Sequence, residues 1–192
     1  MRIAPLPPWR QALERRLYIV GMPQAGSTLC YNLCRILLEA EGYTVRSWVQ
    51  DRGILYYHEG SKEQHYTLVK QHDLPTTSRL YQEKLETTHI FNIRRDLRDS
   101  IASAYRKFVN KEEFDIAAMC KRNIEWHRVW EEMADYEWVY EDFKANPLEI
   151  VKQIQPQLKV NLAPAQQRRI IQRAETLKEE VGTIKTQVDR ME

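Results

Sequence analysis

The sequence predicts an α/β fold in which a mostly parallel central sheet is flanked by helices. Short apolar runs of strand length alternate along the chain with longer segments whose apolar residues recur at helical spacing, as such folds require. The length of 192 residues suits one domain with one core, and no internal repeat or low-complexity segment divides it. A hydrophobic content of 43% and a charged content of 29% indicate an ordinary globular protein.

Composition also narrows the expected partners. A net charge of +2 gives no general field for polyanions, so nucleic acid is not expected and any basic site must be local. No apolar run approaches the roughly eighteen residues of a membrane span, and residues 1–16 lack the apolar centre of a signal peptide. We therefore expect a cytoplasmic protein without a membrane partner. Cys30, Cys34 and Cys120 have no metal-type cluster around them, which predicts buried, reduced thiols.

The first third of the chain is organised around a glycine loop. Residues 1–16 contain three prolines and are expected to form an N-terminal arm that leads into the first strand. A buried strand is expected at 17–20, a tight loop at 21–26, and then a helix with leucines at helical spacing that ends near Gly42.

The remaining elements follow from the same patterns. Strands are expected at 43–49, 65–72, 88–93 and 136–140, with a polar, aromatic surface loop at 50–64. Helices are expected from Asp96, which can act as an N-cap, at 112–134, from Pro147, and at 163–192.

The glycine loop carries the first functional signal. Its backbone amides, the N-terminus of the next helix and the hydroxyls of Ser27 and Thr28 can converge on a phosphate-like anion. A loop that merely turns a strand into a packed helix is the alternative interpretation. Ser27 stands where the pattern G-x-x-x-x-G-K-[ST] needs its lysine, so hydrolysis of ATP or GTP is disfavoured.

Two strand ends carry further signals. Lys70 and His72 are two residues apart on one strand, so they project to one face at the edge where parallel sheets bind ligands. Arg95 at a strand-to-helix junction offers forked donors for a phosphate and can extend toward Ser103. The alternatives are a polar strand end without function and surface pairing of arginine with aspartate.

Taken together, four stretches resemble the sulfotransferase family, which moves a sulfuryl group from 3′-phosphoadenosine 5′-phosphosulfate (PAPS) to a hydroxyl or an amine. They occur in the family's order along residues 17–155. Residues 21–28 look like its 5′-phosphosulfate loop, Lys70-Gln71-His72 like its Lys-x-His strand end, Arg95 through Ser103 like its 3′-phosphate motif, and Tyr140-Glu141-Asp142-Phe143 with Pro147 like its tyrosine segment.

The resemblance implies a single sulfotransferase-like domain over residues 1–192, with a three-layer, P-loop-like fold, PAPS as donor and no metal. His72 would be the general base, and Lys70 would stabilise negative charge. The donor would be held by Gln24, Ala25, Gly26, Ser27 and Thr28 at its 5′ side, by Arg95 and Ser103 at its 3′-phosphate, and by Tyr140 near the adenine.

This sequence departs from the family in two places. Gln24 stands where the family usually has Lys or Arg, and no Arg-Lys-Gly segment occurs near the C-terminus. A non-catalytic module that binds PAPS or adenosine 3′,5′-bisphosphate is therefore an alternative, and a nucleotide kinase is a weaker one. The acceptor, expected to be a small molecule or a carbohydrate selected by loops at 50–64 and 73–80, and the oligomeric state are left open.

Overall fold

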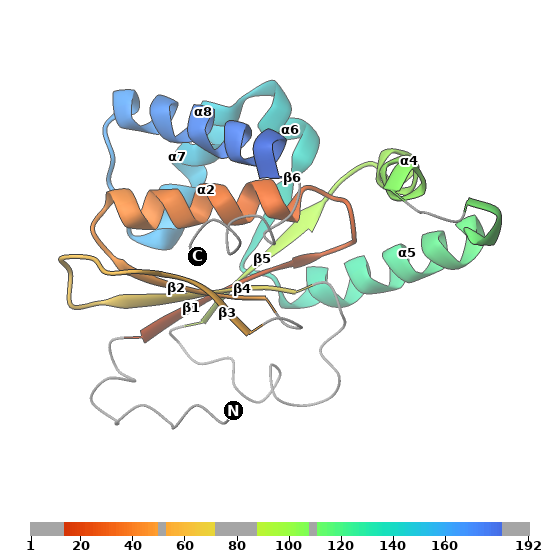
Figure 1. Ribbon diagram of the computed structural model, residues 1–192, viewed down its shortest axis with the longest axis horizontal. Helices are drawn as coiled ribbons and strands as arrows, with labels where there is room; N and C mark the ends of the chain where they lie inside the picture. The colour runs from red at the N-terminus through yellow and green to blue at the C-terminus, as the bar shows by residue number, and fades with distance from the viewer. Residues whose placement is uncertain (1–13, 50–52, 72–87, 108–110, 182–192) are drawn as a thin grey trace.

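A computed structural model describes residues 14–49, 53–71, 88–107 and 111–181 (Figure 1). The fold is α/β, as predicted, with a six-stranded sheet in the order β3-β2-β4-β1-β5-β6. All pairings in that sheet are parallel except that between β2 and β3. The neighbours β2 and β4, β4 and β1, and β1 and β5 are not consecutive in sequence, so the chain crosses over between these strands.

The bounds of the elements are as follows. The strands are β1 (Glu14–Gly21), β2 (Thr44–Val49), β3 (Gly53–His58), β4 (His65–Lys70), β5 (Thr88–Arg94) and β6 (Tyr136–Val139). The helices are α2 (Ser27–Ala40), α4 (Leu97–Lys107), α5 (Ile116–Met133), α6 (Tyr140–Ala145), α7 (Pro147–Leu158) and α8 (Pro164–Val181), with a short 3-10 helix at Lys111–Glu113.

The two faces of the sheet are covered by different helices. Along β1, Leu17 and Ile19 point into the main core, where α2, α7 and α8 pack. Val20, on the other face, joins a smaller cluster with Trp130 and Met133 of α5. This alternation follows from the two-residue period of a strand. In Figure 1, α2, α7 and α8 accordingly lie on one side of the sheet and α5 runs along the other.

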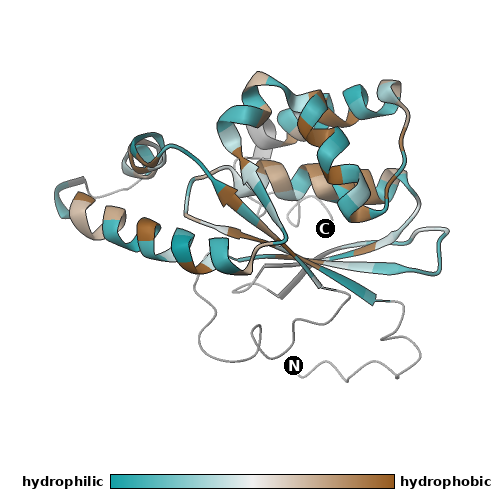
Figure 2. Cartoon of the chain, turned by 180° about the vertical axis from the view of Figure 1, so that it is seen from behind, coloured by the Kyte–Doolittle hydropathy of each residue, from teal (hydrophilic) through white to brown (hydrophobic). Residues whose placement is uncertain are grey.

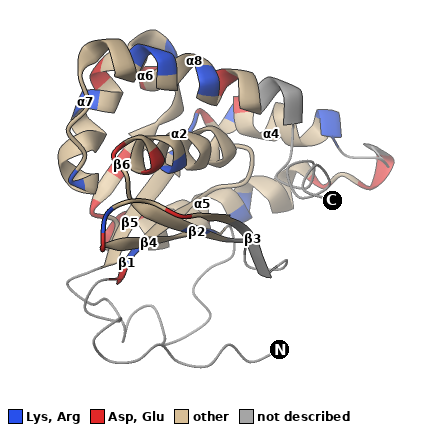
Figure 3. Cartoon of the chain, turned by 60° about the vertical axis from the view of Figure 1, so that its left-hand side comes forward, with Lys and Arg blue, Asp and Glu red and all other residues tan. Residues whose placement is uncertain are grey.

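Hydrophobic and charged residues are distributed differently over the fold. The centre of the sheet carries the brown, hydrophobic colour of Figure 2, whereas the helices alternate between brown and teal. In Figure 3, Lys and Arg lie among Asp and Glu over α6, α7 and α8 rather than forming a field of one sign. None of the helices in the described residues is both long enough and apolar enough to cross a bilayer.

Two boundary predictions are wrong. Residues 53–58 were expected in an irregular loop but form β3, which pairs antiparallel with β2 through a register shift between Ser47 and Trp48. Hydrogen bonds to β2 pair one side of the backbone of this edge strand. The strand was missed because its sequence has no alternating pattern. Residues 14–16 were assigned to the N-terminal arm but already pair with β4, Glu14 opposite His65. The rest of that arm, 1–13, lies outside the described residues.

The other elements match the predictions closely, except that Tyr140, expected at the end of a strand, begins the short helix α6. The long helix begins at Ile116 rather than at 112, because the Asp115 side chain accepts a hydrogen bond from the amide of Ala118 over 2.9 Å and caps it. Cys30 and Cys34 are free, buried thiols 4.0 Å apart, as expected, whereas Cys120 is only partly buried. Burial is the main cause that raises the pKa of the Cys30 thiol, and the neighbouring Cys34 adds to it, so the thiol stays protonated.

Candidate functional site

The glycine loop is a tight turn in which three residues have positive φ angles. Gly21 and Gly26 have φ of 125° and 100°, and Gln24 between them has φ of 63°. A Cβ at Gly21 would lie 2.3 Å from the Ile93 carbonyl oxygen of β5, and one at Gly26 would lie 2.5 Å from the ring of Tyr140. Glycine is thus needed at both positions, since it alone lets the loop approach these neighbours in this conformation.

Lys70 connects the end of β4 to the loop. Its ammonium donates a hydrogen bond to Thr28 Oγ1 over 2.8 Å, in the first turn of α2. Lys70 has the parity of Tyr66 and Leu68, both buried on the α2 face of the strand. The strand period therefore directs its side chain toward the helix N-terminus, where the first amides have no acceptor within the helix.

Arg95 connects the end of β5 to the same loop. Its guanidinium donates to the backbone carbonyl of Gln24 over 3.3 Å and lies 4.5 Å from the centroid of the Tyr140 ring. Ion pairs with Asp99 and Glu141 are longer, at 3.9 and 4.0 Å. Arg95 is thus held over the loop by a ring and a carbonyl while its carboxylate partners stay at the limit of ion-pair distance.

Helix α4 is fastened to the loop by residues that the sequence did not single out. Ser100 Oγ donates to the Pro23 carbonyl over 2.6 Å and accepts from Asn123 Nδ2 of α5 over 3.3 Å. Lys107, at the end of α4, donates to Gln24 Oε1 over 2.8 Å. The signal in the sequence was the seven-residue spacing of Ser100 and Lys107, which places both on one face of a helix.

The start of α4 is fixed as the sequence predicted. Asp96 Oδ1 accepts from the amides of Arg98 and Asp99, at 2.9 and 3.4 Å, and its carboxylate also pairs with the Arg98 guanidinium. Hydrogen bonding by the Arg98 side chain, helped by those amides, lowers the pKa of Asp96 to about 2. A negative charge is thereby kept at the helix N-terminus, where the helix dipole favours it.

The site lies where the strand connections diverge. From β1 the chain continues through α2 toward β2 on one side of the sheet order, and from β5 it continues through α4 and α5 toward β6 on the other. β1 and β5 are neighbours, with Gly21 opposite Ile93. In open α/β sheets, ligands bind at this kind of topological switch, outside the carboxyl ends of the strands.

The structure therefore brings together most of the predicted site residues that it describes. Contacts join Thr28 to Lys70, Gln24 to Arg95, and both Gly26 and Arg95 to Tyr140. His72 lies outside the described residues, as does the predicted acceptor loop at 73–80. The remaining three sit as follows: Ala25 is buried and its amide donates to the Met22 carbonyl, Ser27 is buried, and Ser103 is partly buried on the α4 face that carries Ser100 and Lys107.

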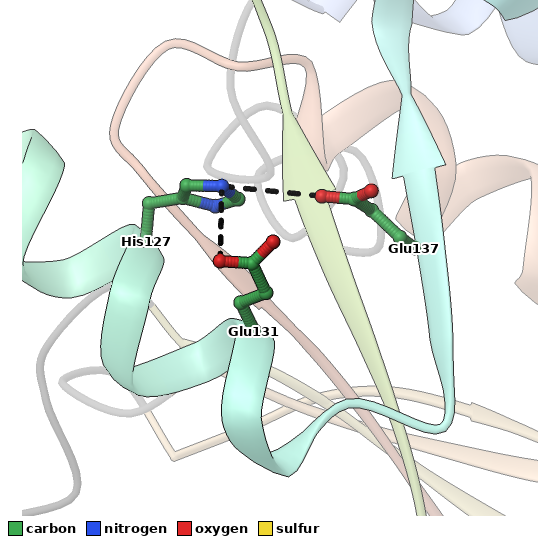
Figure 4. Close-up of side chains that lie close together, drawn as sticks. All are labelled: His127, Glu131 and Glu137. Atoms are coloured by element: carbon green, nitrogen blue, oxygen red, sulfur yellow. Dashed lines mark ion pairs between the residues drawn. The ribbon is translucent and has the colours of Figure 1, made fainter.

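A second polar cluster lies beside the sheet edge (Figure 4). His127 Nε2 lies 3.9 Å from a carboxylate oxygen of Glu131, one turn along α5, and 4.0 Å from one of Glu137 on β6. The atoms of these three residues that could coordinate a metal ion lie within 4.8 Å of one another, a grouping that the sequence analysis missed. Asn92 Nδ2 lies 3.2 Å from His127 Nδ1, and Arg94 Nε lies 3.5 Å from Glu137. The arginine already compensates one carboxylate, so the cluster has the composition of an ion-pair network that links α5 to β6.

Two cations, Lys70 and Arg95, thus reach a loop whose helix N-terminus favours negative charge, and an anion of phosphate type is the natural ligand for that arrangement. Comparisons with protein-family models and with curated proteins found no match for the chain.

Proposed function

We propose that this chain is a metal-independent sulfotransferase of P-loop-like, three-layer architecture that uses PAPS as donor. The observation that carries the proposal is the convergence of three sequence-distant motifs on one loop. Lys70 contacts Thr28, Arg95 contacts Gln24, and Tyr140 packs on Gly26. Parallel pairing alone brings the strand ends to one edge of the sheet, but here the side chains also contact the same loop, which supports a shared ligand.

The residues present fit a doubly phosphorylated adenosine. Arg95 Nε is buried and lacks a hydrogen-bond partner among the described residues, so the guanidinium retains an unused donor. In the proposal, Thr28 and the first amides of α2 bind the 5′-phosphosulfate, Arg95 and Ser103 bind the 3′-phosphate, and the exposed part of Tyr140 packs near the adenine. The weak, 3.9–4.0 Å pairs of Arg95 with Asp99 and Glu141 can then give way to a phosphate, a stronger acceptor.

The chemistry asks for positioning and electrostatic stabilisation. The acceptor oxygen attacks sulfur in line, the bond from sulfur to the phosphate oxygen breaks, and adenosine 3′,5′-bisphosphate leaves with the electron pair. His72 takes the acceptor's proton in this proposal, because an imidazole titrates near neutrality. Lys70 is suited to stabilise the departing charge, since it already reaches the helix N-terminus that is proposed to bind the phosphate. Free thiols at all three cysteines suit a reducing compartment, and we propose that the reaction takes place in the cytoplasm.

A non-catalytic module that binds the same nucleotide is the second candidate. It is favoured by Gln24, whose carboxamide brings no charge to the position where the family usually has a cation. Such a module would retain the contacts of Arg95 and Tyr140 but transfer nothing.

Two measurements test these candidates. Isothermal titration calorimetry should show that adenosine 3′,5′-bisphosphate binds at least about tenfold more tightly than ADP, since only the former offers a 3′-phosphate to Arg95. Transfer of radiolabelled sulfate from PAPS to a panel of phenols, sugars and amines then separates the enzyme from the module, with His72→Ala as the inactive control. Absence of bisphosphate binding would overturn both candidates, and binding without transfer to any acceptor would leave the module.

A further inference from the structure

The loop receives a cation from an unexpected element. Lys107, the last residue of α4, donates to Gln24 Oε1 over 2.8 Å. Gln24 is a residue of the tight turn, with φ of 63°, and its own carbonyl already accepts from Arg95. Gln24, an uncharged residue in a strained loop, is thus contacted by two cations. Arg95 contacts its backbone carbonyl, and Lys107 contacts its side-chain carboxamide.

The position of Lys107 is set by a rigid element. Ser100, two turns earlier on the same face of α4, is bonded to the Pro23 carbonyl over 2.6 Å and supported by Asn123 of α5. Ser100 is fully buried, so this attachment is part of the packed structure. The helix therefore runs past the loop with Ser100 at one end and Lys107 at the other, and Ser103 lies between them on the same face.

An exposed hydrogen bond between lysine and glutamine contributes too little free energy to explain why Lys107 is ordered against the loop. Ordering a lysine side chain costs up to about 2 kcal/mol of conformational entropy, and a solvent-exposed hydrogen bond returns little of it. A charge delivered to a bound anion is a stronger reason, since a charge-assisted contact is roughly twice as strong as a neutral one. Gln24, as an acceptor with no charge of its own, can aim the ammonium without neutralising it.

We propose that Lys107 is a donor-binding residue of this site, and that it supplies from helix α4 the positive charge that the loop lacks at Gln24. Gln24 is then a positioning residue for Lys107. This inference rests on the proposed function, because it assumes that the loop binds the phosphosulfate end of PAPS.

Calorimetry with adenosine 3′,5′-bisphosphate tests the proposal. Lys107→Gln should weaken binding about tenfold and reduce its dependence on salt, because one cation–anion contact is lost. Arg106→Gln is the matched control, since it removes the same charge from the adjacent, exposed position of α4 and should change the dissociation constant less than twofold. Lys107→Arg, which retains the charge, should bind within about threefold of the parent chain.

A swap of the two side chains gives a second test that does not depend on loss of function. In Gln24→Lys/Lys107→Gln the charge returns to the loop, and the affinity lost in Lys107→Gln should be restored. No binding to the parent chain would refute the proposed function itself. Binding to the parent chain with an equal effect of Lys107→Gln and Arg106→Gln, or without rescue by the swap, would overturn the role of Lys107 alone.

Discussion

The ammonium of Lys70 lies 2.8 Å from Thr28 Oγ1 and joins the end of β4 to the first turn of α2. The two residues are far apart in sequence and come together because β4 pairs directly with β1, which leads into the loop. A cation at a helix N-terminus is unfavourable for the helix dipole unless an anion lies between them. The proposed anion site would account for this contact.

Lys70→Met should lower the rate of sulfuryl transfer about 100-fold, because it removes a charge-assisted donor aimed at the leaving group. Stability should change by less than about 2 kcal/mol, since the methionine retains the packing of the aliphatic chain. Lys152→Met, which removes an exposed lysine paired with Glu149 on α7, is the control and should transfer at the parental rate. Equal rates in both variants would exclude Lys70 from the reaction.

Arg95→Gln should abolish the preference for adenosine 3′,5′-bisphosphate over ADP, because the fork that is proposed to bind the 3′-phosphate is lost. Arg94→Gln makes the same change one residue earlier, where the side chain pairs with Glu137 instead. Competitive calorimetry with both nucleotides should show the preference retained in Arg94→Gln. If Arg95→Gln retained it too, the 3′-phosphate would have to be bound elsewhere.

Two serines on one face of α4 should separate stability from binding. Ser100→Ala removes the hydrogen bond to the part-buried Pro23 carbonyl and the acceptor of the buried Asn123 amide, so it should lower the free energy of unfolding by about 1–3 kcal/mol. Ser103→Ala should leave stability within about 0.5 kcal/mol but weaken bisphosphate binding severalfold. Urea unfolding and calorimetry on the same two variants check this, and the reverse pattern would contradict it.

Glu41 should give the fold a pH-dependent contribution. Burial by itself would raise the pKa of this carboxyl, but hydrogen bonds from Lys62 Nζ at 2.7 Å and the Asn161 amide at 2.9 Å outweigh it and hold the pKa below its ordinary value. Because the folded-state pKa is lowered, the contribution is present above the unfolded-state pKa and is lost as pH falls through the folded-state value.

Urea unfolding at about pH 7 and about pH 3.5 measures this effect. Glu41→Gln should destabilise the protein at the higher pH and reduce the loss of stability on acidification. Glu149→Gln, which removes an exposed carboxylate from α7, should leave the pH dependence nearly parental. An unchanged acid sensitivity in Glu41→Gln would show that other groups carry it.

The elements were largely predictable because their patterns are local. The apolar run of β1, the helical spacing of the α2 leucines and the capping residue Asp96 each act within a few positions of the chain. The edge strand β3 was missed for the converse reason, since its backbone is satisfied only by β2 and its residues show no alternation.

For the site, the sequence by itself determined the chemistry available: glycines for a strained turn, hydroxyls after it, and cations at two strand ends. Only the tertiary structure decided which of these groups meet. Parallel pairing of β1 with β4 and β5 brings their carboxyl ends to one edge, and this places Lys70 and Arg95 on the same loop. The spacing of Ser100 and Lys107 places them on one face of α4, but the neighbour that this face contacts is set by the long-range packing of α4 against the loop.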